Sequence, residues 1–348
     1  MSAAEGPGFH CTLEKAKEVL APFQARQNMS KYVVKRLFSG LITVFLVFVI
    51  NFILIHIAPG DPVSVMMGKD NNDPALRAAL MEKYGLDKPL YVQFYRQMTN
   101  TLKGDLGDSY IYSRPVADMI SEKLMPTLGL VFPAALIALI IGAAMGIIAA
   151  RHEGSLIDTI FSGLSYILNA MPSFWLGIML IILFATNLSL LPSSGMVDMR
   201  AGYTGFRYVL DLLRHLALPL GTLILVDIPY YYRIAKSSVL QVSNEEFITT
   251  FRATGMSEKK IFNKYVFKNA ILPVVTVFGI TMAFLISGVS LIEIVFAWPG
   301  TGRLTLTAIN QRDYNVLMGM YLVVSIMVAL TMIVVDIIYA MLDPRIRY

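Results

Sequence analysis

Residues 128–150 read LGLVFPAALIALIIGAAMGIIAA and contain no charged side chain. A helix that crosses a bilayer needs about 20 apolar residues, because each residue spans 1.5 Å of a hydrocarbon core about 30 Å thick. This stretch therefore predicts a membrane-spanning helix. The whole chain agrees, since 56% of its 348 residues are hydrophobic and 15% are charged, whereas soluble proteins carry roughly 25% charged residues.

The same composition excludes other classes of protein. A soluble globule of this size would need more polar residues to cover its surface, and a disordered chain would need low hydrophobicity and high net charge. The single cysteine excludes a disulfide scaffold and a zinc cluster. We therefore predict an all-α, polytopic membrane protein.

Five further apolar stretches are long enough to cross a bilayer. The third of the six spans is too long for one perpendicular helix and too short for two, and Pro172 interrupts it, so we expect one long, kinked or broken helix. The predicted spans run from about Leu37 to Ala58, Leu128 to Ala150, Ile157 to Leu191, Leu216 to Leu240, Ile271 to Ile292 and Val316 to Leu342.

The distribution of Lys and Arg orients these spans, because cytoplasmic loops are enriched in both residues. More than half of the 29 basic residues fall on one side, at 15–36, 151, 233–268 and 345–347. We therefore place both termini in the cytoplasm and read the net charge of +5 as topology rather than as a nucleic-acid signal. The two short outer loops hold Arg200, Arg207, Arg214, Arg303 and Arg312.

Segment 59–126 predicts a small helical domain outside the membrane. Asp73 before Pro74 is typical of a helix start, and Gly85 is typical of a helix end. A second helix is expected over Pro89–Leu102. Such a domain either caps the bundle or forms a docking surface for an extracellular partner, and the pattern alone favours the cap.

A third short helix of the outer domain is expected after Arg114-Pro115. The predicted spans then divide the whole chain into five parts. They are a cytoplasmic extension (1–30), the first membrane helix (31–58), the extracytoplasmic helical domain (59–126), spans two to six with a cytoplasmic loop at 241–270 (127–342), and a cytoplasmic tail (343–348).

The cytoplasmic loop 241–270 carries the strongest local pattern. Ser243 and Glu246 have the spacing of a capping box, and Gly255 is expected to end the short helix that follows. Phe247, Ile248 and Phe251 give this helix one apolar stripe.

A second, basic helix is predicted to follow, with Ser257 as its cap. Short helices of this kind are marginally stable alone, so their apolar faces need a surface to pack on. Anionic lipid and a groove on a cytosolic protein both fit, and the spacing alone does not separate them. The second helix carries Ile261, Phe262, Tyr265 and Val266 on one side and Lys259, Lys260, Lys264 and Lys268 on the rest.

Tests for chemistry in the sequence give negative results. No GxxxxGK[ST] phosphate-binding loop occurs, and Gly300-Thr301-Gly302 is interpreted as a turn. Ser194 lacks the glycine two residues before it that a hydrolase elbow needs, and the four histidines are scattered. We predict no catalytic residue, no metal site and no cofactor in this chain.

Ionisable residues inside spans cost about 2.5–3.5 kcal/mol each on insertion scales and usually face a cavity or a partner. Asp227 lies near the middle of span four, before Tyr230 and Tyr231. It either lines a polar pathway or accepts hydrogen bonds from a neighbouring helix. We expect Asp336 to pair with a nearby basic residue and Glu293 to be a solvated or interfacial acid.

From Tyr32 to Tyr348 the chain resembles the permeases of binding-protein-dependent ABC importers, in the dipeptide/oligopeptide/nickel branch, and within it the first of the two permease subunits. The order and spacing of several short motifs carry this resemblance. They are Ala58-Pro59-Gly60-Asp61-Pro62, Lys83-Tyr84-Gly85-Leu86-Asp87 with Pro89, Gly104-Asp105-Leu106-Gly107 with Ser109, Pro172-Ser173-Phe174, Trp298-Pro299-Gly300 with Gly302, Asp336, and Asp343-Pro344-Arg345.

The cytoplasmic loop is similar to the family's coupling loop through Phe251-Arg252-Ala253-Thr254-Gly255, although Thr249-Thr250-Phe251 stands where the general motif has Glu-Ala-Ala. The resemblance implies that this helix enters a cleft on an ATPase subunit. The implied coupling residues are Glu245, Glu246, Phe247, Ile248, Phe251, Arg252, Ala253, Gly255 and Ser257.

The resemblance also implies partners: a homologous second permease, two ATPase subunits that bind ATP and Mg, an extracytoplasmic substrate-binding protein, and the lipid of a bacterial inner membrane. Asp227, Tyr230 and Tyr231 are the expected residues of the translocation path. Peptides are the expected substrate, with nickel chelates, glutathione and small glycosides as competitors. A secondary transporter and a membrane scaffold stay as alternative classes. Docking of the binding protein is expected at Asp61, Asp105, Asp108 and Arg303.

Overall fold

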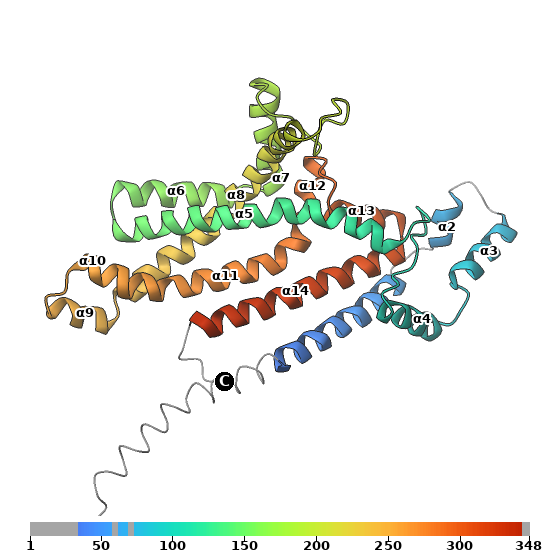
Figure 1. Cartoon of the computed structure of the whole chain (residues 1–348), viewed down its shortest axis with the longest axis horizontal. Helices are drawn as coiled ribbons and strands as arrows, with labels where there is room; N and C mark the ends of the chain where they lie inside the picture. The colour runs from blue at the N-terminus through green and yellow to red at the C-terminus, as the bar shows by residue number, and fades with distance from the viewer. Residues whose placement is uncertain (1–33, 58–61, 69–72, 343–348) are drawn as a thin grey trace, which may run out of the picture.

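The computed structural model describes residues 34–57, 62–68 and 73–342, and these residues fold into helices joined by loops, of which those after α4 and after η1 are long (Figure 1). Within those ranges the only β-type pairing is an isolated bridge between Asp108 and Pro115. The first helix described runs over Val34–Ile57. The others are α2 (Pro62–Met67), α3 (Pro74–Tyr84), α4 (Leu90–Leu102), α5 (Val116–Arg151), α6 (Leu156–Ala170), α7 (Ser173–Leu180), the π-helix η1 (Ile181–Asn187), α8 (Phe206–Ser243), α9 (Glu246–Ala253), α10 (Glu258–Ile261), the π-helix η2 (Phe262–Val266), α11 (Phe267–Gly288), α12 (Ser290–Val295), α13 (Thr301–Gln311) and α14 (Tyr314–Leu342).

Five helices in the described part of the chain are long and apolar enough to cross a membrane, and a bent pair brings the total to six if it is one span. The bent pair joins α6 to α7 and η1 at an angle of 102°, next to Pro172. This confirms the broken helix predicted for the third span. The five single helices cover Val34–Ile57, Val116–Arg151, Phe206–Ser243, Glu258–Met282 and Tyr314–Ile337.

Helices α5 and α8 pack against each other along the centre of the bundle. Their closest approach is at Gly142 and Gly146, where an added Cβ atom would lie 2.8 Å from the Ile228 carbonyl oxygen and 2.5 Å from that of Tyr232. Small residues on one helix let the backbone of another come this near. The glycines near the end of span two are therefore the place where α8 crosses.

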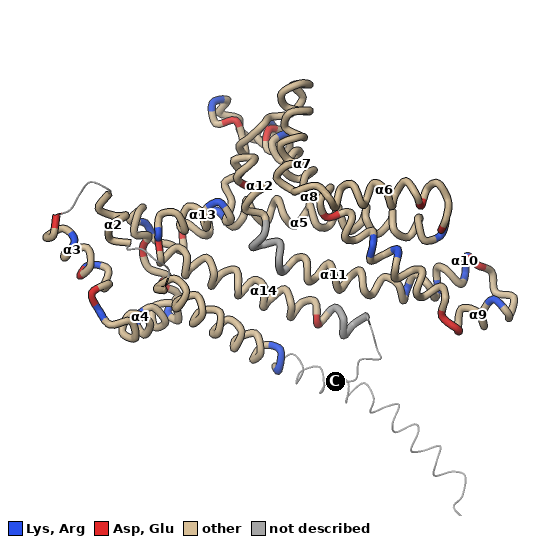
Figure 2. The backbone as a smooth tube through the Cα atoms, turned by 180° about the vertical axis from the view of Figure 1, so that it is seen from behind, with Lys and Arg blue, Asp and Glu red and all other residues tan. Residues whose placement is uncertain are grey.

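Short helices and charged residues gather at two opposite ends of the bundle (Figures 1 and 2). Helices α2–α4 gather at one end and the α9–α10 hairpin lies at the other, and charged residues concentrate at these ends and on the loop beyond η1. At the first end, the Asp73 carboxylate accepts a 2.9 Å hydrogen bond from the Ala75 N–H, and Gly85 ends α3 with φ 68°. Both predicted signals of this helix are confirmed.

The outer helices pack onto the bundle rather than standing apart. Phe94 and Met98 of α4 lie against a buried cluster that includes Phe48 and Phe52 of the first helix and Val316 of α14. The short helix expected after Arg114-Pro115 is the first part of α5, which continues without interruption into span two.

Candidate coupling and translocation sites

The hairpin of α9 and α10, predicted to lie in the cytoplasm, is built onto the ends of three long helices. Ile248 of α9 is fully buried, and it packs in one cluster with Ala150 of α5, Val239 of α8 and Ile261 of α10. The position of α9 is therefore tied by close packing to the ends of α5 and α8.

The apolar stripe of α9 is divided between two surroundings. Ile248 points into the chain's own core, whereas 39% of the Phe247 surface is exposed. The Phe251 ring contacts two other aromatic rings, with its centroid 6.1 Å from that of Phe247 and 4.3 Å from that of Tyr265. The chain itself thus provides part of the packing surface that the short helix needs, and Phe247 remains available for a partner.

The predicted capping box is wrong. Ser243 is the last residue of α8, and Glu245 occupies the N-cap position of α9 without a side-chain hydrogen bond. The reason is that α8 extends beyond the predicted end of span four, so that only two residues remain between the helices and Ser243 is itself helical.

The end of α9 and the start of α10 follow the prediction. Gly255 has φ +78°, and its N–H donates to the Arg252 carbonyl oxygen at 3.0 Å. Ser257 takes the N-cap position of α10 by its backbone, without a side-chain hydrogen bond. The Arg252 guanidinium bridges the turn by an ion pair of 2.8 Å with the Glu258 carboxylate.

The basic helix that was predicted to follow α9 is not a separate element. It runs through η2 into α11, so α10 and the fifth span form one helix with a π-helical turn. The Arg151 guanidinium, at the end of α5, lies 4.5 Å above the centre of the Phe262 ring in that turn. The wider π-turn therefore lies where the hairpin meets the end of α5.

Asp227 is partly buried in α8, and its Oδ2 atom has no hydrogen-bond partner among the described residues. Tyr230, one turn further, is 40% exposed, whereas Tyr231 is fully buried in a cluster with Ala138 of α5 and Ile228 of α8. The structure thus separates the two tyrosines that the sequence pattern grouped, with Tyr231 in the core.

A polar cluster that the sequence pattern did not indicate links α6 to α8. The Lys236 ammonium contacts the Asp158 carboxylate, and the Ser162 hydroxyl lies 2.8 Å from the Tyr232 hydroxyl. Asp158 lies inside the third apolar stretch and Lys236 inside the fourth span. Two opposite charges placed at the same depth of neighbouring spans were the available signal for this pair.

The expected pairing of Asp336 is confirmed, since its carboxylate lies 2.9 Å from the Arg36 guanidinium.

The expectation that Glu293 is a solvated or interfacial acid is wrong. Glu293 is fully buried, and its carboxylate accepts hydrogen bonds from the Thr127 hydroxyl at 2.6 Å and from the Arg303 N–H at 3.0 Å. The helix breaks after Gly288, and α12 directs Glu293 toward the N-terminus of α13. A carboxylate is stabilised there, because the first N–H groups of a helix lack partners within it.

The segment Gly300-Thr301-Gly302, interpreted as a turn, is the start of α13. Thr301 donates its N–H to the Thr127 hydroxyl at 2.8 Å, and the Trp298 indole N–H donates to the Pro126 carbonyl oxygen at 2.9 Å. We call the connected side chains of Thr127, Glu293, Trp298 and Thr301 the outer clasp. It joins α5, α12 and α13 in the outer half of the bundle.

The expected docking residues do not form one cluster. Asp105 and Asp108 are exposed in the loop before α5 and line a cavity of about 250 Å³ beneath the outer helices. Arg303 is exposed on α13 and does not line that cavity. Asp61, and with it most of the motif at 58–62, lies outside the described residues, as do residues 1–30 and the motif at 343–345.

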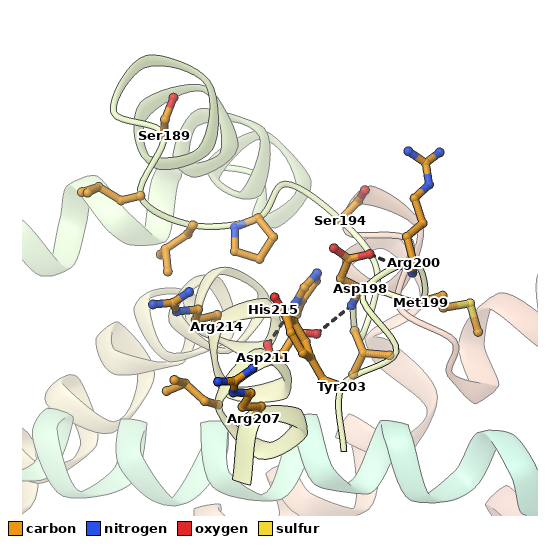
Figure 3. A pocket seen from close by; sticks show the side chains of 15 residues that line it. Ser189, Ser194, Asp198, Met199, Arg200, Tyr203, Arg207, Asp211, Arg214 and His215 are labelled. Carbon is orange, nitrogen blue, oxygen red and sulfur yellow. Dashed lines mark hydrogen bonds and ion pairs between the residues drawn. The ribbon is translucent and has the colours of Figure 1, made fainter. Parts of the chain in front are cut away.

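The largest of the described cavities, about 950 Å³, opens between the loop after η1 and the first turns of α8 (Figure 3). Arg200, Arg207 and Arg214 line it together with Asp198, Asp211 and His215. Asp211 accepts a 2.7 Å hydrogen bond from the Asp198 N–H and lies 3.4 Å from the His215 ring nitrogen. Sequence reasoning counted these arginines only as loop charge. In the described part of the chain no three His, Cys, Asp or Glu side chains gather closely enough to hold a metal ion.

Comparison with known families gives two matches that together cover nearly the whole chain. The model described as "Binding-protein-dependent transport system inner membrane component" matches residues 142–348. A model described as "Binding-prot-dependent transport system membrane comp, N-term" matches residues 29–131.

Curated relatives are similar over their full length. The oligopeptide transport system permease protein AppB of Bacillus subtilis (strain 168) is 34% identical over 92% of this chain and 100% of its own length. The di/tripeptide transport system permease protein DppB of Pseudomonas aeruginosa (strain UCBPP-PA14) is 36% identical, and the two proteins are covered to 92% and 99%. The glutathione transport system permease protein GsiC of Escherichia coli O6:H1 is 38% identical over 92% of this chain and 100% of its own.

Among solved structures, the chain is similar to one described as "Inward facing conformations of the MetNI methionine ABC transporter". The TM-score is 0.51 at 17% sequence identity, and the match covers 65% of this chain and 96% of that one. At this identity the likeness extends to the fold only.

Proposed function

This chain belongs to the inner membrane components of binding-protein-dependent ABC transport systems, and we propose that it imports di- or oligopeptides as one of two permease subunits. The observation that carries the proposal is the end-to-end similarity to permeases named for oligopeptide and di/tripeptide transport. The family is one of transport subunits without a catalytic site, which leaves the secondary transporter and the scaffold without support.

In the proposed importer, two ATPase subunits bind ATP and Mg and drive the cycle. The α9–α10 hairpin contacts one of them, with the exposed Phe247 side chain as its apolar anchor and with Glu245, Glu246, Arg252 and Ala253 around it. Three features support this role: the exposure of Phe247, the buried packing of Ile248, and the link through η2 to α11. Closure of the ATPases would then move the hairpin and, with it, the ends of α5 and α8.

The translocation path would lie between this chain and the homologous second permease. Tyr230 is proposed to face it because it is 40% exposed. Asp227, one turn away, is proposed to join it when the path opens, because its buried Oδ2 atom has no partner among the described residues and such a charge is costly unless water or a substrate reaches it. The chain would lie in a bacterial inner membrane with both termini in the cytoplasm. The binding protein would dock on the opposite side, near Asp61, Asp105, Asp108 and Arg303.

Glutathione is the second candidate substrate, because the relative with 38% identity is named for glutathione transport. Both candidates carry a free carboxylate and an amine. Nickel, either as a chelate or as an ion, has less support, since no cluster of metal-ligating side chains occurs in the described residues.

The test is uptake by the reconstituted complex. The two permeases, the ATPases and the binding protein are placed in proteoliposomes, and uptake of radiolabelled dialanine, glutathione and nickel is measured with and without ATP. The proposal requires ATP-dependent uptake of the dipeptide that also depends on the binding protein. Uptake that persists without ATP, or uptake restricted to nickel, would contradict it.

A further inference from the structure

We propose that the cavity at the outer end of α8 is a carboxylate-binding site, which receives the free carboxylate of a peptide on the outer side of the membrane. This inference rests on the proposed function for its substrate class, but the site itself follows from three features of the cavity: its unpaired cations, the uncapped start of α8, and its size.

The first of these features is the set of arginine side chains that line the cavity. None of the guanidinium groups of Arg200, Arg207 and Arg214 has an acidic partner among the described residues, although Asp198 and Asp211 line the same cavity (Figure 3). Those two carboxylates are engaged elsewhere. Asp198 accepts from the Arg200 N–H at 2.9 Å, and Asp211 accepts from the Asp198 N–H and lies beside His215. Asp198 in the loop and Asp211 in α8 thus hold the loop backbone in place and leave the guanidinium groups of Arg207 and Arg214 available to a ligand, while that of Arg200 extends away from them (Figure 3).

The start of α8 adds a second positive element. Gly205 holds the N-cap position without a side-chain hydrogen bond, and the first turn contains no acidic residue. Arg207 lies in that turn, where a helix favours negative charge and disfavours a cation. Local stability alone would favour an acid at this position, so the present arrangement fits an anion supplied from outside.

The cavity also has the size of a site for a small solute. Its volume of about 950 Å³ lies within the range of roughly 300–1,000 Å³ that small-molecule sites occupy. Arg207 and Arg214 are two turns apart on one helix, a rise of about 10 Å, and Arg200 comes from the facing loop. A guanidinium pairs with a carboxylate through two parallel hydrogen bonds, whereas a hydrated metal cation would be repelled by the guanidinium groups of Arg207 and Arg214. The site therefore selects carboxylate-bearing solutes against free nickel ions.

The test measures binding to the purified, detergent-solubilised permease–ATPase complex in the absence of the binding protein. The probes are diglycine and its C-terminal amide, titrated against the labelled complex. We expect diglycine to bind and the amide to bind about tenfold more weakly, because a hydrogen bond between charged groups is lost. The double substitution Arg207→Gln and Arg214→Gln should weaken diglycine binding by about tenfold or more.

The control is Lys103→Gln, which removes one exposed positive charge from the outer helices and should leave binding unchanged. Co-purification of the ATPases with each variant shows that the complex is assembled. Equal affinity for diglycine and its amide, or full binding by the assembled double variant, would overturn the proposal. So would displacement of diglycine by phosphatidylglycerol, since that would assign the arginines to a lipid headgroup.

Failure of this site and failure of the proposed function are distinguishable. If the wild-type complex shows no ATP-dependent peptide uptake but binds diglycine through these arginines, the import proposal fails and the site stands. If uptake is intact while the wild-type complex does not bind diglycine, the site is wrong and the import proposal stands.

Discussion

The Thr127 hydroxyl in α5 donates a 2.6 Å hydrogen bond to the buried carboxylate of Glu293 in α12, a residue 166 positions further along the chain. Because the same carboxylate also accepts from the N-terminus of α13, this contact fixes three helices relative to one another. A movement of any one of these helices must therefore carry the whole unit with it or break these hydrogen bonds.

Replacing Glu293 tests the outer clasp directly. Glu293→Ala removes the acceptor of the buried Thr127 hydroxyl and of the part-buried Arg303 N–H, which costs about 1–3 kcal/mol, so the unfolding midpoint of the detergent-solubilised complex should fall. Glu293→Gln keeps the shape of the side chain and one acceptor oxygen. Its unfolding midpoint should lie between those of the wild type and of Glu293→Ala. Glu82→Gln, on the exposed face of α3, is the matched control and should unfold like the wild type. An unchanged midpoint for Glu293→Ala would contradict the role of the clasp.

Gly300 is required by the clasp for steric reasons. An added Cβ atom would lie 2.0 Å from the Glu293 Oε1 atom and 2.5 Å from the Thr127 hydroxyl oxygen, both of which are held in place. Gly300→Ala should therefore lower the unfolding midpoint and reduce the yield of assembled complex. Gly129→Ala provides the comparison, because Gly129 lies in α5 with no atom within 4 Å of the added carbon. Alanine is a better helix former than glycine by about 1 kcal/mol, so that variant should be as stable as the wild type or more so.

The features that sequence reasoning predicted correctly depend on local properties. Length and apolarity within one stretch determine whether it can cross a bilayer, and the caps at Asp73 and Gly85 depend on residues within one turn. The break at Pro172 is local as well. None of these predictions required knowledge of which segments meet in space.

The features that were missed depend on contacts between distant segments. Glu293 looks solvent-exposed at the end of a span, and only the return of α13 and the presence of Thr127 make it a buried acceptor. Lys236 and Asp158 are 78 residues apart, and their pairing requires that α6 lie beside α8. The capping box failed for another reason, since Ser243 could either extend α8 or cap α9, and the longer helix gained more hydrogen bonds.

Two neighbouring residues of α9 should separate folding from coupling. Ile248→Ala removes a fully buried side chain and should destabilise the complex by about 2–5 kcal/mol. Phe247→Ala removes a side chain that is 39% exposed, so stability should change little while ATP-driven uptake falls about tenfold, as for an interface anchor. Thermal unfolding and uptake are measured on both variants. Normal uptake by a folded Phe247→Ala complex would remove Phe247 from the proposed ATPase contact.

Gly255 allows the turn between α9 and α10 to be tested through its backbone alone. Its φ of +78° is unfavourable for other residues, although nothing lies within 4 Å of an added Cβ atom. Asparagine tolerates this conformation best, alanine less well, and proline cannot adopt it and also lacks the N–H that bonds to Arg252. Uptake should therefore decrease in the order Asn, Ala, Pro, with transport abolished in Gly255→Pro while the ATPases still bind nucleotide. Uptake by the Gly255→Pro complex would show that the turn is not needed for coupling.

Replacing Asp227 should leave the stability of the complex intact or raise it, and should lower transport. Its Oδ2 atom has no partner among the described residues, so the carboxylate destabilises the span that holds it. Asp227→Asn removes the charge at nearly constant volume, and the complex should be at least as stable while ATP-driven peptide uptake falls. Asp336→Asn is the matched control, because that carboxylate is paired with Arg36 near the cytoplasmic end of the bundle. It should lower stability slightly and leave uptake per assembled complex unchanged. If Asp227→Asn transports at the wild-type rate, the carboxylate does not line the path, and the unpaired oxygen needs another explanation.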